Sequence, residues 1–460
     1  MAPPSAIHAH RAAGRSAHPR MAAMLAVMAA VAMASLDTAI ANTALPSMAT
    51  QLQATPAASV WIVNIYQLAM VATLLPFAAL GEIAGYRRVF LAGLITFTAA
   101  SLACALAWSL PALIAARFLQ GVGASAVMAV TTALIRTIYP ASQQGRGFGT
   151  NALVVAVAFA IGPTLSSLIL SAASWPWLFA INLPFGLAAW WMARGHLPDN
   201  VRATHRFDYL AACYNAIGFG ALVLLFGEGA HGAAPQQWLP LLAVAAISFI
   251  LLLRRQRHHT APMLPVDLFR KPVFTLSALT ASCTFAVQGA ALVSLPFYFE
   301  AMGRSAIATG FLITPWPVMV AIMAPIAGRL SERYPAGALC GAGLLLMCVG
   351  VGTLIALPSA ASDYAIAWRM ALCGAGFGLF QAPNMKAIMH SAPASRAGSA
   401  SGIVATARLM GQATGAATVA GCFLLAGASG PRDALIAAAV FAALGAAASF
   451  ARLKFKPGSA

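Results

Sequence analysis

The chain has 460 residues, of which 61% are hydrophobic and only 8% are charged, and its formal net charge at pH 7 is +17. A typical soluble domain has about 25% charged residues, so this composition excludes a soluble globular domain, and it is too apolar for a disordered chain. The sequence therefore predicts a polytopic membrane protein. The seven cysteines lie in or beside apolar segments, and we expect them to be packing residues that form neither a disulfide framework nor a metal site.

Apolar segments long enough to cross a bilayer follow one another along the whole chain. A membrane-spanning helix needs about 20 mostly apolar residues. We expect fourteen such helices, at approximately residues 21–46, 59–80, 88–107, 110–133, 148–171, 175–194, 208–228, 237–253, 273–297, 306–328, 336–357, 364–386, 400–427 and 431–451. The loops between them are short, and the sequence contains no G-x-x-x-x-G-K-[ST] phosphate loop, so transport would use a gradient or be passive.

Basic residues alternate between the expected loops. Most of the 27 Lys and Arg residues fall in one set of alternate loops and in the two tails, whereas the other loop set holds only Arg304 and Arg432. Positive loops lie on the cytoplasmic side of a membrane protein, so we expect both termini in the cytoplasm and a multi-pass location in the plasma membrane, of the bacterial inner-membrane kind. No single segment carries the charge, which disfavours nucleic-acid binding.

Asp37 is the one acidic residue that lies well inside an apolar segment. An ionised carboxylate in the bilayer costs roughly 2.5–3.5 kcal/mol on insertion scales, and desolvation favours its neutral form. A carboxyl group that is retained in this position suits a proton or cation site. The alternative is a hydrated, structural residue near the end of the helix.

Arg117 lies inside the fourth expected helix and shares one face of it with Gln120, Gly121 and Ala124. An arginine does not usefully deprotonate, so its expected role is electrostatic: it would favour the ionised form of a nearby carboxyl group and so release its proton. The alternative is a structural bond between two helices.

Other polar and aromatic residues within the apolar segments are candidates for the wall of a cavity. Singly, each of these is more often a packing residue than a ligand contact, and for Arg408 function and structure are equally favoured. The candidates are Asn42, Asn64, Gln67, Gln120, Gln288, Trp316, Phe380, Gln381, Asn384 and Arg408. Gly162 and Pro163 interrupt the fifth helix, because proline removes a backbone hydrogen bond, and form either a packing seam or a mechanistic kink.

Five short segments along the chain form a set of motifs. In chain order they are residues 36–46 (LDTAIANTALP), 117–123 (RFLQGVG), the pair Gly162 and Pro163, 175–186 (WPWLFAINLPFG) and 407–415 (ARLMGQATG). Together they resemble the motifs of the major facilitator superfamily, and more closely those of its fourteen-spanning drug:proton antiporter branch. The resemblance covers almost the whole chain.

A loop motif is repeated in the two halves of the chain. Residues 78–88 (AALGEIAGYRR) are similar to the family motif G-x-x-x-D-R-x-G-R-R, although Glu82 replaces the aspartate, and residues 328–333 (GRLSER) form a second copy. The recurrence supports two related six-helix bundles. The resemblance implies a gating role for Glu82, Gly85, Arg87, Arg88, Gly328, Glu332 and Arg333. The fifth-helix motif departs from the family pattern, because Ser166 and Ser167 stand where the family has two glycines.

The fold implied by the resemblance is an all-α major facilitator fold, with two six-helix bundles and two inserted helices. The expected organisation is a cytoplasmic tail at 1–20, an N-terminal bundle at 21–195, a connecting segment with two extra helices at 196–272, a C-terminal bundle at 273–451 and a cytoplasmic tail at 452–460. We expect a monomer.

The function implied by the resemblance is proton-coupled efflux of amphipathic or cationic drugs and antiseptics by alternating access. Asp37 and Arg117 would couple the proton. The energy source would be the proton gradient, without a cofactor or metal, and the partners would be a small-molecule substrate, protons and the lipid bilayer. Two alternatives stay open, namely an exporter of a specific metabolite on the same fold and a non-transporting membrane scaffold or sensor. A membrane enzyme is disfavoured, since no His/Asp/Glu constellation is visible.

Overall fold

The computed structural model describes residues 17–140, 143–199, 207–230, 235–256, 266–358, 361–391 and 397–455. Most of both expected tails, 1–20 and 452–460, therefore lies outside the described residues, as does part of the expected connecting segment at 196–272.

Helices make up the whole of the described secondary structure. In chain order they are α2 (Ala17–Gln51), α3 (Pro56–Ser59), α4 (Trp61–Ala84), α5 (Tyr86–Ala105), α6 (Leu110–Ile138), α7 (Gln144–Ala172), α8 (Pro176–Ala180), α9 (Asn182–His196), α10 (Tyr209–Ala230), α11 (Pro235–Gln256), η2 (Val266–Arg270), α12 (Pro272–Ala301), α13 (Ala306–Ile313), α14 (Pro315–Arg333), α15 (Ala336–Ile355), α16 (Asp363–Ser391), α17 (Ala397–Ala426), η4 (Gly427–Ser429), α18 (Gly430–Ala451) and η5 (Arg452–Lys454).

Each expected span falls on one of these helices or on two consecutive ones. Within the described residues, eleven helices are long and apolar enough to cross a membrane. The expected spans at 175–194, 208–228 and 364–386 fall outside that group. For the first of these the reason is length, because the span is divided between α8 and α9, and α9 has only 15 residues. The all-helical, multi-pass architecture is thus confirmed, and the number fourteen stays a prediction.

Equivalent helix starts appear in the two halves of the chain. Thr55 caps α3 by accepting a hydrogen bond from the Ala58 backbone N–H at 3.2 Å, and Ser305 caps α13 in the same way through Ala308 at 3.2 Å. Both caps have extended backbone, as a side-chain oxygen that satisfies a free N–H requires. Each short helix leads directly into a long one, α4 or α14, which is the local signature of two related halves.

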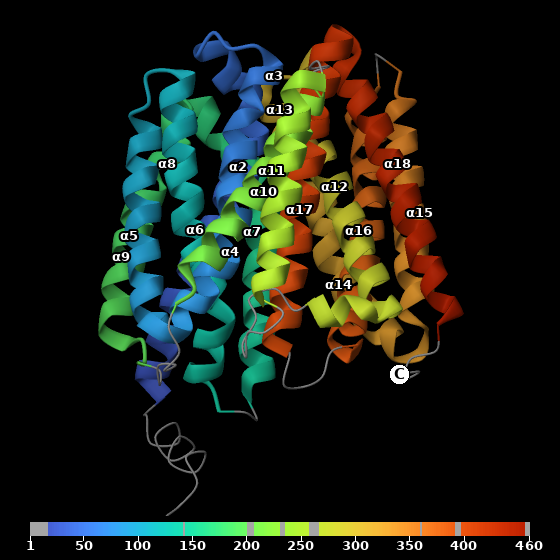
Figure 1. The fold of residues 1–460 in the computed structure, drawn as a ribbon. Coiled ribbons are helices and arrows are strands. Elements are labelled where there is room, and N and C mark those ends of the chain that lie inside the picture. Colours follow the sequence, from blue (N-terminus) through green and yellow to red (C-terminus); the bar gives the residue numbers. More distant parts are fainter. Residues whose placement is uncertain are drawn as a thin grey trace, which may run out of the picture.

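The helices pack into two bundles with a helical hairpin between them (Figure 1). In the first half α6 packs against α4 and α5, and α2 against α7 and α9, while in the second half α12 packs against α17 and α18, and α16 against α14 and α15. The hairpin consists of α10 and α11, and α10 lies against α4 and α17. Asn215 of α10 donates to the Ala72 carbonyl of α4 at 2.9 Å. The hairpin therefore contacts both halves through α10.

The first and last described residues lie at the same end of the molecule, which is the lower end in Figure 1. This arrangement is the one expected of a chain that crosses the membrane an even number of times. We call this end the terminal end. That it faces the cytoplasm stays a prediction from the positive loops.

Closely packed glycines hold α17 against α12. A Cβ atom at Gly415 would lie 2.7 Å from the Ala290 backbone N and closer still to the Ala286 carbonyl oxygen. A Cβ atom at Gly352 of α15 would have no other atom within 4 Å. Small residues of this kind allow helix backbones to approach closely within a membrane.

We predict that Gly415→Ala lowers the free energy of unfolding by about 1–3 kcal/mol, because the added methyl group forces α12 and α17 apart. Thermal unfolding in detergent measures the effect, and Gly352→Ala is the matched control, with an unchanged or higher midpoint. Equal midpoints for the two variants would contradict this account of the α12–α17 contact.

Candidate functional site

A buried ion pair lies inside the N-terminal bundle. Asp37 of α2 and Arg117 of α6 are 2% and 1% exposed, and Arg117 Nη1 pairs with Asp37 Oδ2. The structure thus brings together the two charges that the sequence places inside apolar segments. A buried pair is stable only when the remaining polar atoms of both groups are also bonded.

Amide and hydroxyl groups from neighbouring helices complete the bonding of the Asp37 carboxylate. Gln120 Nε2 donates to Asp37 Oδ1 at 2.8 Å, and Asn182 Nδ2 of α9 donates to the same oxygen at 3.2 Å. Both amides also donate to the Ser101 hydroxyl of α5, at 2.9 and 3.5 Å. The carboxylate therefore accepts three bonds from donors on α6 and α9.

The Arg117 guanidinium is bonded on its other sides as well. Its Nε donates to the Ile62 carbonyl oxygen at 3.1 Å, and Nη1 also donates to Gln120 Oε1 at 2.6 Å. Its Cζ lies 4.1 Å from the centre of the Tyr66 ring and 5.6 Å from that of Phe179. Such stacking is favourable for an arginine removed from water. We call Asp37, Arg117, Gln120, Asn182 and Ser101 the Asp37 network.

Sequence reasoning did not find three of the groups around this pair. Asn182 occurs in the quoted segment 175–186, but it was given no role, and Ser101 and Tyr66 were not singled out. The one signal for Ser101 in the sequence is that it is a polar residue within an apolar segment. Which helix each of them faces depends on how α2, α4, α5, α6 and α9 pack, and the sequence of one helix does not contain that information.

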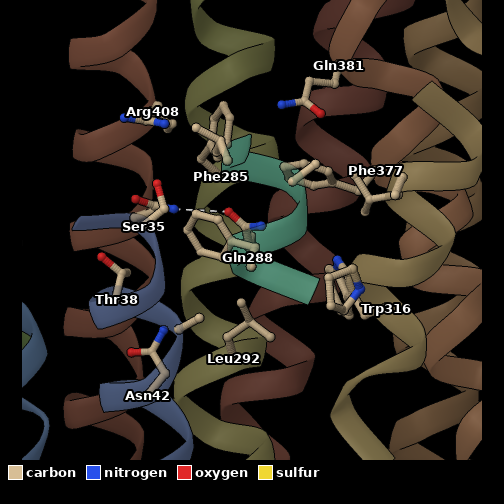
Figure 2. Close-up of a pocket in the computed structure, with 18 of the residues that line it drawn as sticks. Ser35, Thr38, Asn42, Phe285, Gln288, Leu292, Trp316, Phe377, Gln381 and Arg408 are labelled. Atoms are coloured by element: carbon tan, nitrogen blue, oxygen red, sulfur yellow. Dashed lines mark hydrogen bonds between the residues drawn. The ribbon is translucent and has the colours of Figure 1, made fainter. Parts of the chain in front are cut away.

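A cavity of about 690 Å³ lies between the two bundles. Its wall is mostly apolar, with a small number of amide and hydroxyl groups, and it is formed by side chains of α2, α4, α6, α7, α12, α13, α14, α16 and α17. Figure 2 shows the labelled residues converging on this space from both halves. An apolar wall with a few placed polar groups is typical of a small-molecule site.

The structure divides the ten predicted cavity residues into two groups. The residues that line the cavity are Asn42, Gln67, Gln288, Trp316, Gln381 and Arg408. The residues that do not line it are Asn64, Gln120, Phe380 and Asn384. Gln120 belongs to the Asp37 network, and Phe380 packs against the rings of Phe285 and Phe377. Asn384 Oδ1 accepts a hydrogen bond from Arg452 at 2.8 Å, and Asn64 is buried in α4.

The two faces of α2 separate the cavity from the Asp37 network. Ser35, Thr38 and Asn42 line the cavity, whereas Asp37 does not. The spacing of these three residues is that of one helical face, and Asp37 points from another face into the N-terminal bundle. Tyr66 belongs to both regions, because it lines the cavity and stacks on Arg117.

Hydrogen bonds between the bundles close the cavity at the end opposite to the terminal end. Thr164 Oγ1 of α7 lies 2.7 Å from Thr314 Oγ1, and the Ser167 hydroxyl donates to the Ala306 carbonyl oxygen at 2.9 Å. A Cβ at Gly310 would collide with the Ser167 hydroxyl. The serine that replaces a family glycine thus contacts the second bundle.

The predicted antiporter motif lies on the wall next to this closure. Pro163 lines the cavity, and Gly162 faces Ala39 of α2 so closely that a side chain there would collide with the Ala39 methyl group. Ser166 donates to the Ile40 carbonyl oxygen at 3.3 Å. This part of α7 therefore packs against α2 and, through Ser167, against α13.

The predicted gating loops lie at the terminal end of the two halves. Gly85 has φ of +107°, which favours glycine, and lies between α4 and α5. Arg87 donates to the Arg194 carbonyl oxygen at 2.6 Å and pairs with Asp199 at 3.5 Å, so this loop contacts the end of α9. The side chains of Glu82 and Arg88 are exposed.

The second copy of the loop motif ends α14. Gly328 is half-buried, Glu332 and Arg333 are exposed, and Lys386 of α16 donates to the Ser331 carbonyl oxygen at 2.7 Å. Each loop motif therefore bonds to another helix of its own half. Among the described residues, no group of three or more His, Cys, Asp or Glu side chains could hold a metal ion.

An all-helical, multi-pass chain with two related bundles around a central apolar cavity has the architecture of a membrane transporter. The sequence model of the Major Facilitator Superfamily matches residues 27–416, and the chain belongs to this superfamily. Its members are transporters rather than enzymes, so the family and fold are those of a transporter.

Comparison with known proteins agrees with this assignment. The chain is 48% identical over 437 residues to "Uncharacterized transporter YebQ" of Escherichia coli (strain K12), covering 94% of this chain and 96% of that one. It is 33% identical over 390 residues to "Multidrug resistance protein Stp" of Mycobacterium tuberculosis (strain ATCC 25618 / H37Rv), covering 84% and 72%. Its fold is similar to that of a bacterial homologue of the human lysosomal transporter Spinster, with a TM-score of 0.68 and 17% identity over 96% of this chain and 98% of that one.

We predict that Arg117→Leu lowers the free energy of unfolding by about 3–5 kcal/mol, because it leaves the Asp37 carboxylate buried without its counter-charge. The double variant Arg117→Leu/Asp37→Asn should be more stable than Arg117→Leu alone, since the second change removes the unpaired charge. Unfolding of the purified variants in detergent measures both. A double variant that unfolds as readily as the single one would contradict the ion pair.

Proposed function

We propose that this protein exports amphipathic drugs in exchange for protons by alternating access of one central cavity. The observation that carries the proposal is the Asp37 network, a fully bonded carboxylate that lies beside the cavity but outside its wall. Two further observations support drug export: the wall of the cavity is mostly apolar, and the chain is related to the multidrug resistance protein Stp.

Protonation of Asp37 is the proposed coupling step. A proton on Asp37 removes the charge that Arg117 neutralises, so the attraction between α2 and α6 weakens. Because Thr38 and Asn42 lie on the other face of α2, any shift of this helix changes the cavity wall. When the proton leaves, the carboxylate pairs with Arg117 again and the network forms as before. Substrate and proton thus compete through α2 rather than at one shared atom.

The proposed orientation places both termini in the cytoplasm and the protein in a bacterial inner membrane as a monomer with fourteen spans. The positive loops support this orientation. The hydrogen-bonded closure at Thr164, Ser167 and Ala306 would then face outward, and the state described here would take up its cargo from the cytoplasmic side. The loops at Arg87 and Arg333 would gate that side.

We predict that Asp37→Asn abolishes proton movement driven by a substrate gradient, because an amide cannot exchange the proton. The protein is reconstituted in liposomes that contain pyranine, a pH-sensitive dye, and gradients of an anionic, a neutral and a cationic amphipath (8-anilinonaphthalene-1-sulfonate, Nile red and ethidium) are imposed in turn. Asp433→Asn, a change of the same type at a half-buried residue in the first turn of α18, is the matched control and should leave coupled flux unchanged.

Downhill substrate movement is measured in the same liposomes and separates coupling from transport. Asp37→Asn should retain some substrate movement with no proton flux. If the variant couples substrate to protons as the unmodified protein does, Asp37 is not the proton site. If the unmodified protein moves no protons with any substrate that it transports, proton exchange is wrong.

A further inference from the structure

The wall of the cavity carries an uneven charge. Among the described residues that line it, Arg408 of α17 is the only charged one, and none is acidic. Asp37 does not balance this charge, because it points away from the cavity and its carboxylate is already bonded to Arg117, Gln120 and Asn182. The cavity therefore has a net positive wall.

Arg408 differs from Arg117, Arg369 and Arg452, three other buried or half-buried arginines. Arg117 has an ion pair, Arg369 donates to the carbonyl oxygens of Thr353 and Ala365, and Arg452 donates to side chains of three residues, Ser277, Asn384 and Ser449. Arg408 makes no hydrogen bond or ion pair within the described part of the chain, and its Nε is buried without a partner. The residue as a whole is half-buried and lines the cavity, so an anion that enters the cavity would supply the partner that this guanidinium lacks.

Further unpaired polar atoms lie on the same wall. Ser35 Oγ, Gln67 Oε1, Asn42 Oδ1 and Trp316 Nε1 line the cavity and are buried without a hydrogen bond within the described part of the chain. Ser35 and Trp316 can donate to a bound molecule, and the amide oxygens can accept from one. The cavity thus offers several bonds to one polar ligand in addition to the Arg408 charge.

The wall is ordered along the axis of the molecule. Helix α2 begins at the terminal end. Ser35 is therefore nearer to that end than Asn42 is. In Figure 2, Arg408 and Gln381 lie on the Ser35 side, whereas Trp316 lies deeper, toward Asn42. A molecule that enters from the terminal end would meet the charge before the aromatic surface.

We infer that the substrates of this cavity are amphipathic anions, whose carboxylate, sulfonate or phosphate group binds Arg408 while the apolar body packs against Phe285, Phe377 and Trp316. This inference rests on the proposed function, because it names the substrate class of the same cavity. A guanidinium fits such groups well, since it donates two parallel hydrogen bonds. Cationic drugs, the other class implied by the family resemblance, would face an unpaired positive charge without an acidic partner.

Three probes with one apolar body and different charges test the inference. They are naphthalene-2-sulfonate, 2-naphthalenemethanol and (2-naphthylmethyl)trimethylammonium. Equilibrium dialysis measures their binding to the full-length protein in phosphatidylcholine nanodiscs, with the signal of empty nanodiscs subtracted and no proton gradient present. The sulfonate should bind most tightly and the ammonium most weakly.

Two substitutions of Arg408 and a control identify the charge responsible. Arg408→Gln should weaken sulfonate binding about tenfold or more, the scale of one charge-assisted hydrogen bond, and change binding of the neutral probe by less than about threefold. Arg408→Lys should retain much of the preference for the anion, and Arg432→Gln, at an exposed arginine of α18, should retain all of it. Unchanged binding of the neutral probe shows that a variant is folded.

The inference is overturned if the unmodified protein prefers the cation or the neutral probe, or if Arg408→Gln keeps the preference for the sulfonate. These binding results do not depend on transport. If the sulfonate binds through Arg408 but the liposomes show no proton exchange, the coupling mechanism fails and the substrate class stands. If protons are exchanged but sulfonate binding does not depend on Arg408, the substrate class fails and the coupling mechanism stands.

Discussion

The ion pair between Asp37 and Arg117 determines how the N-terminal bundle is arranged. Two charges are buried among apolar helices, and they are tolerated because donors from α6 and α9 bond the carboxylate while a carbonyl of α4 and the Tyr66 ring bond and stack on the guanidinium. Helices α2, α4, α6 and α9 are therefore linked by these polar contacts, within a bundle whose core is otherwise mostly apolar. A change in the charge of one carboxyl group affects all of them at once.

The position of this pair relative to the cavity determines the form of the proton coupling that we propose. A carboxylate on the wall could exchange a proton for a cationic cargo directly, because both would use the same oxygen atoms. Here the carboxylate lies on the other face of α2, and the link to the cargo is α2 itself together with Tyr66, which reaches both regions. In the proposed mechanism, competition between proton and cargo is therefore conformational, and it does not require the cargo to be a cation.

More of the fold than of the candidate site could be predicted from the sequence. Apolar length locates the helices, since each expected span falls on one helix or two consecutive ones, and the cost of a buried charge identifies Asp37 and Arg117. The partners of that pair could not be found in this way, because Ser101 and Asn182 are ordinary polar residues until packing brings them to the carboxylate. For the same reason Phe380 and Asn384 were reasonable cavity candidates, although the rotation of α16 places them against Phe285 and Arg452 while Gln381 faces the cavity.

Arg117 in the first half and Arg408 in the second half have opposite environments. In the first half Arg117 is paired and enclosed, so its charge acts on one carboxyl group and is not felt as a free charge in the cavity. In the second half Arg408 is unpaired and faces the cavity, so its charge acts on whatever enters. In the mechanism that we propose, the first half therefore binds the proton and the second half recognises the charge of the cargo. With this division, an amphipathic anion would itself be the counter-ion of Arg408. The net charge moved across the membrane when such an anion is exchanged for a proton would then differ from the net charge moved when a cationic drug is exchanged.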